Sequence, residues 1–301
     1  MKRKLLIAGG CSYTDAKFLS LDKNVKQQSW AMWPKYLGRD LGLKVINTGH
    51  CGVGNETIFH SVMEQILMYK NRVDTVAIAW TEFDRHRFFG VAELMPLSET
   101  IISLSQNPLH PDGQSADYDH RAQLGIPNLM QNFFSSKSFY FIRDQYMKTV
   151  LHDGFRYILM MAEYCKAHGI KYIFSAALDP LNTRMYEKLA TDLPMCIPPG
   201  WDKFPPFNRT EEFNFWCNNP FFSALEKNHV DNLIGWPFKP LYGGYTIDSA
   251  RYGAKKPFDL VQSYAEAKRR YDVSDKDFHP NEEAQQLIGK MYYDKFKEIY
   301  K

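Results

Sequence analysis

Short apolar runs that alternate with amphipathic segments constrain the fold of this chain more than any other feature. Four runs have the length of buried strands, over residues 5–8, 44–46, 73–80 and 170–177. Apolar residues at helical spacing occupy the stretches 34–42, 55–67, 139–167 and the segment after Asn281. Strands that alternate with helices predict a parallel sheet covered by helices on both faces.

Two long segments depart from this alternation. In the first, residues 85–138, Gly, Pro, Asp and Ser interrupt any periodicity, and the second, residues 180–272, holds ten of the sixteen prolines and three of the six tryptophans. The 301-residue chain also contains 21 Phe and 18 Tyr, so these segments are too apolar to resemble disordered chains. We therefore predict aromatic-rich insertions at about 85–138 and 180–272, the second of them mostly irregular.

Charge and composition exclude several classes of protein. Lys and Arg number 37 against 34 Asp and Glu, a net charge of only +3, which gives no reason to expect a nucleic-acid partner. No apolar run approaches the length of a membrane span, and the run at 5–8 is too short for a signal peptide. The five cysteines form no CxxC pair, which argues against a disulfide framework and against a zinc site.

Ligands of open parallel sheets bind at the carboxyl ends of the strands. Residues 9–14 follow the first predicted strand and contain Ser12 on a glycine turn, and the glycine-rich loop 47–55 follows the second. The segment 275–280, with Asp277 and His279, lies just before the last helix. A serine on a tight turn, a loop with free N–H groups and an Asp/His segment are the parts of an acyl-transfer site.

These residues resemble the blocks of the SGNH (GDSL-type) hydrolases. The Gly-Asp-Ser-x-Thr block of that family is similar to residues 10–14, and its Trp-Pro helix start is similar to residues 33–34. Its second block matches Asn47 and Gly52, and its Asp-x-x-His-Pro block resembles residues 277–280 with one residue fewer. The similarity covers roughly residues 4–84 and 273–299 together with the fourth strand.

The resemblance implies a flavodoxin-like three-layer α/β/α fold with a short parallel sheet, the SGNH hydrolase fold. It also implies a serine esterase in which Ser12 attacks the ester, His279 removes its proton and Asp277 orients the imidazole. The backbone N–H groups of Ser12 and Gly52 would form the oxyanion hole, with no metal or organic cofactor. Because Ser12 and His279 lie at opposite ends of the chain and must meet, we expect one domain over 1–301.

Two departures from the family pattern leave questions open. Phe83 stands where the family has an Asn that donates to the oxyanion, and Asn55 is our candidate replacement, although capping its helix is the simpler role. Asp277 lies two residues before His279 and Asp275 four, whereas the family spacing is three. We prefer Asp277, because it is nearest to the usual position.

Four further residues are candidates for binding the substrate: Tyr13, His50, Trp80 and Arg85. The leading hypothesis is an esterase that removes acetyl or another short acyl group from a carbohydrate or other small ester. A catalytically weakened glycan-binding protein and an O-acyltransferase are the alternatives. We expect a cytoplasmic or virion-associated protein without a nucleic-acid or membrane partner, and leave its oligomeric state open.

Overall fold

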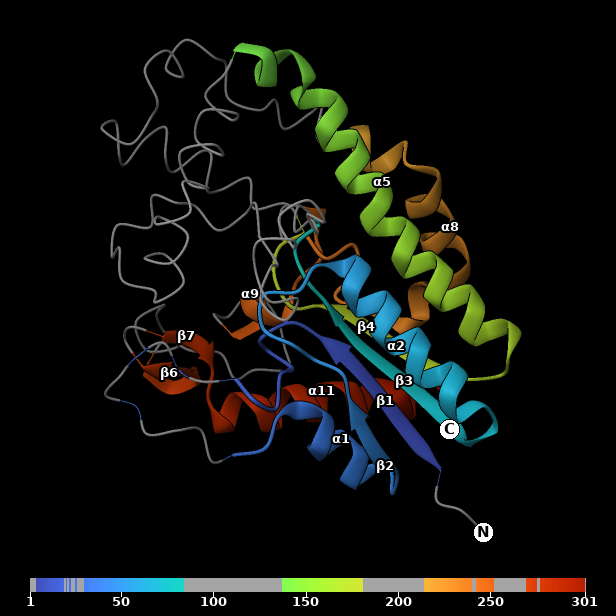
Figure 1. Ribbon diagram of the computed structural model, residues 1–301, viewed down its shortest axis with the longest axis vertical. Coiled ribbons are helices and arrows are strands. Elements are labelled where there is room, and N and C mark those ends of the chain that lie inside the picture. Colours follow the sequence, from blue (N-terminus) through green and yellow to red (C-terminus); the bar gives the residue numbers. More distant parts are fainter. Residues whose placement is uncertain are drawn as a thin grey trace, which may run out of the picture.

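The core of the molecule is a five-stranded parallel sheet with strand order β2-β1-β3-β4-β5 (Figure 1). The computed structural model describes residues 4–18, 20, 22, 25, 30–83, 137–180, 214–239, 242–251, 269–274 and 277–300. Within 137–180, side chains are described from residue 148 onward. The strands are β1 (Leu5–Gly10), β2 (Lys44–Asn47), β3 (Val73–Trp80), β4 (Lys171–Ala176) and β5 (Leu233–Ile234). This order is that of flavodoxin-like doubly wound sheets.

Helices cover both faces of the sheet, which gives three layers (Figure 1). Helices of the first face are α2 (Asn55–Tyr69), α5 (Lys137–Ala167) and α8 (Pro220–His229). Those of the second face are α1 (Trp33–Asp40), α9 (Ile247–Arg251) and α11 (Glu282–Ile299). The α/β class and the flavodoxin-like three-layer arrangement predicted from the sequence are therefore confirmed.

Strand β3 shows how one apolar run serves both layers. Its residues Val76, Ile78 and Trp80 belong to the cluster packed against α2 and α5. Ala77 and Ala79 point to the other face, into the cluster formed with α1 and α11. A strand covered on both sides must be apolar at every position, which explains why the run has no alternation in the sequence.

The segment expected to be an irregular second insertion supplies part of the sheet instead. Strand β5 pairs in parallel with β4, with Phe174 opposite Leu233 and Ser175 opposite Ile234. Helix α8 from the same segment packs on α5. The prediction of a mostly irregular 180–272 is wrong for its described part, because a strand of two residues leaves no readable apolar run.

Helix starts follow local chemistry, with one correction. Asn281 caps α11 as predicted, since its side chain accepts a hydrogen bond from Ala284 N at 3.1 Å. Asn55 does not cap α2: it is the first helical residue, and the preceding Gly54 takes the cap position. The Asn55 side chain is therefore free for contacts beyond the helix.

The described residues contain neither a membrane-spanning helix nor a disulfide bond. None of their helices combines the length and apolarity that a bilayer crossing requires. Among their cysteines, Cys11, Cys51, Cys165 and Cys217 are all free thiols.

Gly154 in α5 is required by the packing of Phe83. A Cβ at Gly154 would lie 2.3 Å from the ring of Phe83, which also packs on Phe155 with ring centroids 5.0 Å apart. We expect Gly154→Ala to lower the free energy of unfolding by about 1–3 kcal/mol, because overpacking outweighs the gain of up to about 1 kcal/mol in helix propensity. Urea denaturation measures this change.

The double variant Gly154→Ala with Phe83→Leu should recover part of the loss, since the smaller side chain gives the new methyl group room. A Gly154→Ala protein as stable as the wild type would contradict the packing argument.

Candidate active site

Ser12 lies in a tight turn directly after β1, at the carboxyl end of the sheet. The turn is closed by hydrogen bonds from the N–H groups of Thr14 and Asp15 to the carbonyl of Cys11, at 2.9 and 3.1 Å. The neighbouring Thr14 is fully buried, and its hydroxyl accepts a hydrogen bond from the Trp33 indole. The hydrogen bonds within the turn and the contact with Trp33 therefore hold the turn that carries Ser12 in place.

Three residues from opposite ends of the chain form a hydrogen-bonded line. Ser12 Oγ lies 2.9 Å from His279 Nε2, and His279 Nδ1 lies 2.6 Å from Asp277 Oδ1. A carboxylate only accepts, so the Nδ1 atom carries a proton, and in the neutral form of the ring the Nε2 lone pair faces the Ser12 hydroxyl. This is the tautomer that a general base for Ser12 requires. Asp275, the alternative partner for His279, lies outside the described residues.

The two-residue spacing between Asp277 and His279 follows from their secondary structure. Strand β7 (Asp277–Pro280) pairs antiparallel with β6 (Asp272–Ser274). In an extended strand, residues i and i+2 project from the same face. Asp277 can therefore reach the His279 ring, while Phe278 between them points elsewhere and is 41% exposed.

The Asp277 carboxylate is ionised over the neutral range. Burial alone would raise the pKa of Asp277, but the hydrogen bonds and charge of His279 and the hydroxyl of Ser20 lower it to about 2. A lowered pKa means that the ionised group stabilises the fold above the unfolded-state value near 4. This stabilisation is lost as the pH falls from about 4 through 2.

The glycine-rich loop after β2 is fastened to the serine turn. Cys51 N donates to Asp15 Oδ2 at 2.9 Å, and Asn47 Nδ2 donates to the Thr14 carbonyl at 2.6 Å. A Cβ at Gly49 would come within 2.7 Å of Thr14, so only glycine permits this approach. The contacts of the loop with Thr14 therefore account for the asparagine at position 47 and the glycine at position 49.

Gly52 has φ +77°, and a side chain built on it would meet open space. Neither the Gly52 N–H nor the Ser12 N–H donates to any group in the part of the chain that is described. The Cys51 carbonyl, in the same peptide unit as Gly52 N, accepts from His50 Nδ1 at 2.9 Å. Because the peptide is planar and trans, this contact fixes the direction of the Gly52 N–H.

The prediction that Asn55 donates to the oxyanion is wrong. The Asn55 Nδ2 donates to the carbonyls of Thr81 and Glu82 at 3.1 and 3.4 Å, and its Oδ1 accepts from Thr81 N at 2.9 Å. Both ends of the amide are used to fasten the end of β3 to α2. Phe83, in place of the family's Asn, is buried and cannot replace that donor.

Two of the four predicted substrate contacts are buried instead. Trp80 is fully buried on the α2 and α5 face of β3, where it packs on Phe174. Tyr13 is 5% exposed, and its ring meets the His279 ring edge-on at 5.6 Å. Neither side chain is available to a substrate, because each is enclosed by protein.

The other two candidates have different outcomes. His50 is exposed beside Gly52, so a contact with a substrate stays a prediction for this residue. Arg85 lies outside the described residues.

A buried arginine that the sequence analysis missed supports the site from behind. Arg251 is fully buried, and its Nη1 donates to Asp272 Oδ1 at 2.7 Å. Its Nη2, with two hydrogens, lies within hydrogen-bond distance of three acceptors: the Tyr13 hydroxyl at 2.9 Å, Asp248 at 2.6 Å and the Phe278 carbonyl at 2.9 Å. Arg251 therefore joins the serine turn to β7. Its place in an irregular stretch of sequence gave no signal of this role.

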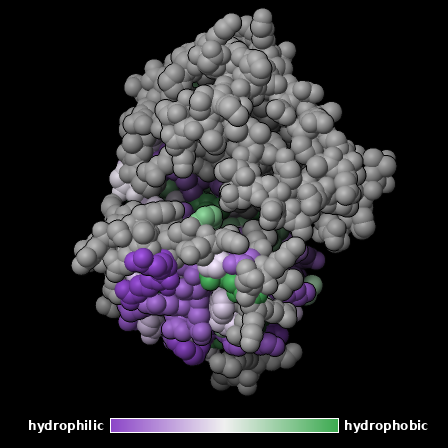
Figure 2. Space-filling view, turned by 90° about the vertical axis from the view of Figure 1, so that its left-hand side faces the viewer, coloured by the Kyte–Doolittle hydropathy of each residue, from purple (hydrophilic) through white to green (hydrophobic). Residues whose placement is uncertain are grey.

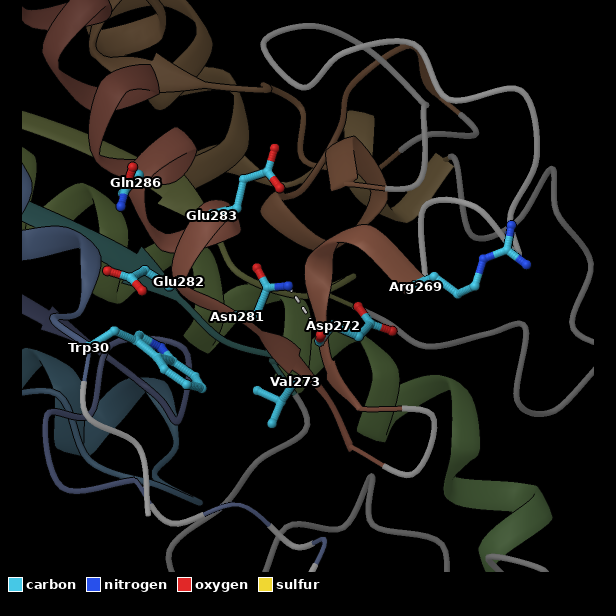
Figure 3. A pocket seen from close by; sticks show the side chains of 8 residues that line it. All are labelled: Trp30, Arg269, Asp272, Val273, Asn281, Glu282, Glu283 and Gln286. Carbon is cyan, nitrogen blue, oxygen red and sulfur yellow. Dashed lines mark hydrogen bonds between the residues drawn. The ribbon is translucent and has the colours of Figure 1, made fainter. Parts of the chain in front are cut away.

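One hollow lies apart from this site, at the start of α11 (Figure 3). It has a volume of about 550 Å³, and neither Ser12 nor His279 lines it. Its lining residues are Trp30, Arg269, Asp272, Val273, Asn281, Glu282, Glu283 and Gln286. Figure 2 shows hydrophilic residues gathered on the lower part of the face that carries β6 and β7. In the described part of the chain, no three His, Cys, Asp or Glu side chains gather as metal ligands would.

No protein-family model matches the chain, and no curated protein is significantly similar to it in sequence. Several solved structures are similar to the chain, and three of them are as follows. A protein assigned to the G-D-S-L lipolytic family from Desulfitobacterium hafniense has 11% identity and a TM-score of 0.41, over 97% of this chain and 99% of that one. An α/β hydrolase enzyme from the metagenome of Lake Arreo, Spain, has 13% identity and a TM-score of 0.38, over 100% and 97%. A protein assigned as a GDSL-like lipase from Parabacteroides merdae has 13% identity and a TM-score of 0.36, over 98% and 96%.

Proposed function

We propose that this protein hydrolyses carboxylic esters with Ser12 as the nucleophile. The observation that carries the proposal is the line Ser12 Oγ–His279 Nε2–Nδ1–Asp277, at 2.9 and 2.6 Å. A serine in a post-strand turn occurs in many proteins, but an imidazole held between a serine and a buried carboxylate is the arrangement that activates a hydroxyl.

The reaction runs in two halves. His279 Nε2 accepts the Ser12 proton while Ser12 Oγ attacks the ester carbonyl, and the imidazolium then protonates the leaving alcohol, which leaves an acyl-serine. In the second half, His279 deprotonates water, the hydroxide attacks the acyl-serine, and the carboxylic acid departs as the proton returns to Ser12. Asp277 stays ionised and stabilises the imidazolium in both halves.

The backbone N–H groups of Ser12 and Gly52 are the proposed oxyanion donors. Their support is that both are without a partner among the described residues and that His50 fixes the peptide of Gly52. With Asn55 engaged elsewhere, no side-chain donor is assigned. Loss of one such donor costs about 10²–10³ in rate in serine hydrolases, so we expect a modest kcat.

The test is hydrolysis of p-nitrophenyl acetate by the wild type, Ser12→Ala and His279→Ala. Both variants should lose the release of nitrophenol above the buffer rate, because each removes an atom that reacts. Ser223→Ala, an exposed serine on α8, is the matched control and should keep full activity. A serine-reactive phosphonate should label the wild type and spare Ser12→Ala. Equal release by the wild type and both site variants would contradict the proposal.

The finer proposal is that the acyl group is short and that the alcohol is a carbohydrate. Its support is the high aromatic content of the chain, since sugar rings stack on aromatic side chains. Trp80 and Trp216 are not among the side chains that could bind a sugar in this way, because both are buried in the core. Release of acetate from acetylated oligosaccharides tests this proposal. Transfer of the acetyl group to an acceptor sugar, detected by mass spectrometry, would instead favour the acyltransferase. Sugar binding without any Ser12-dependent release would favour the glycan-binding protein.

A further inference from the structure

We propose that Ser20 is a positioning residue of this site, which holds the Asp277 carboxylate in the orientation that His279 requires. The inference rests on the proposed ester hydrolysis at Ser12. Ser20 Oγ lies 2.6 Å from Asp277 Oδ2, although the two residues are 257 positions apart in the chain. Ser20 touches neither Ser12 nor the reacting atoms, so it acts through Asp277.

The Ser20 hydroxyl donates this hydrogen bond, because the ionised Asp277 carboxylate can only accept. Asp22 N donates to Ser20 Oγ at 3.1 Å. Since a backbone N–H only donates, Ser20 Oγ is the acceptor there, and its single proton is left for Asp277. A hydroxyl that donates to a carboxylate makes a strong, charge-assisted hydrogen bond.

The two oxygens of Asp277 have separate tasks. Oδ1 accepts from the His279 ring at 2.6 Å and from the His279 backbone N–H at 3.1 Å, whereas Oδ2 accepts from Ser20. Rotation of the carboxylate about its Cβ–Cγ bond would break contacts on both sides at once. Ser20 therefore limits the rotation that would release the imidazole.

The segment that carries Ser20 also holds the histidine ring. Phe18 packs on the His279 imidazole with ring centroids 4.0 Å apart. Asp22 Oδ2 accepts from the Ser274 hydroxyl at 2.8 Å, which fastens the segment to β6. Phe18 and Ser20, which follow the serine turn in sequence, thus contact both members of the Asp–His pair.

Ser20→Ala should lower kcat for p-nitrophenyl acetate about tenfold with KM unchanged, the effect expected for one hydrogen bond to a charged group. The proton resonance of the His279 Nδ1–H should broaden or move upfield at neutral pH, because the less constrained carboxylate exposes that proton to exchange. Ser20→Thr keeps a hydroxyl on the same carbon and should restore both readouts.

Ser223→Ala, the exposed serine on α8, is the matched control, because it removes a serine hydroxyl outside this network and leaves the hydroxyl of Ser20 in place. It should keep kcat and the resonance of the wild type. An equal loss in Ser223→Ala, or a Ser20→Ala protein with wild-type kcat and resonance, would overturn the assignment. If the wild type itself shows no Ser12-dependent hydrolysis, the proposed function fails, whereas the resonance still decides whether Ser20 holds Asp277.

Discussion

Asp277→Asn should lower kcat for ester hydrolysis by about 10⁴, with little change in KM. The wild-type carboxylate can only accept from His279 Nδ1, at 2.6 Å, and so it keeps the proton on that nitrogen. An amide at this position can present its NH₂ group instead, which favours the tautomer with the proton on Nε2, opposite Ser12. In that tautomer the lone pair lies on Nδ1, away from Ser12, and cannot remove the serine proton.

Steady-state kinetics with p-nitrophenyl acetate measure this effect. Asp231→Asn, at an exposed position far from the site in sequence, is the control for the same chemical change and should leave kcat unaltered. A small effect of Asp277→Asn, beside a large effect of His279→Ala, would show that another group orients the imidazole.

Arg251→Met should lower the free energy of unfolding by about 3–5 kcal/mol, the cost of leaving a buried partner charge uncompensated. The side chains of Arg251 and Asp272 are both fully buried, and their atoms lie 2.7 Å apart. The substitution also removes the donor to the Phe278 carbonyl, which lies next to His279. Urea denaturation followed by tryptophan fluorescence measures the change.

Two comparisons make this prediction specific. Arg270→Met breaks an exposed ion pair with Glu283 and should cost no more than about 1 kcal/mol. Adding Asp272→Asn to Arg251→Met should recover part of the loss, because it removes the unpaired charge. Equal effects of Arg251→Met and Arg270→Met would contradict the role of burial.

The sheet could be predicted from the sequence wherever a strand is long and covered on both faces. Strand β3 has eight residues, and its continuous apolar run reveals it, whereas β5 has two and forms only because β4 offers an edge. Trp80 was misplaced for a different reason. Trp80 lies two and four residues after Ile78 and Val76, so its side chain points to the same face of the sheet and into the same core. The alternation of side chains along the strand determines this direction, whereas the prediction relied on the position of Trp80 at the end of the strand.

The site was readable only in part. Ser12 and His279 are recognisable because they adjoin a strand end and a helix start, which leave signals in the sequence. Ser20 contacts Asp277, 257 positions further along the chain. Arg251 contacts Tyr13, 238 positions earlier, inside a buried hydrogen-bond network. No local pattern encodes such contacts, because only the folded chain brings the groups together.

The distance along the chain between Ser12 and His279, 267 residues, has a consequence for synthesis. At the usual rate of about 5–20 residues per second, a ribosome makes the serine roughly 13–53 s before its base. During that interval the emerging chain carries a serine turn without an imidazole to activate it. On the proposed mechanism, the nascent protein cannot acylate itself during that interval, and enzymatic activity begins only after β7 and α11 have left the ribosome and docked.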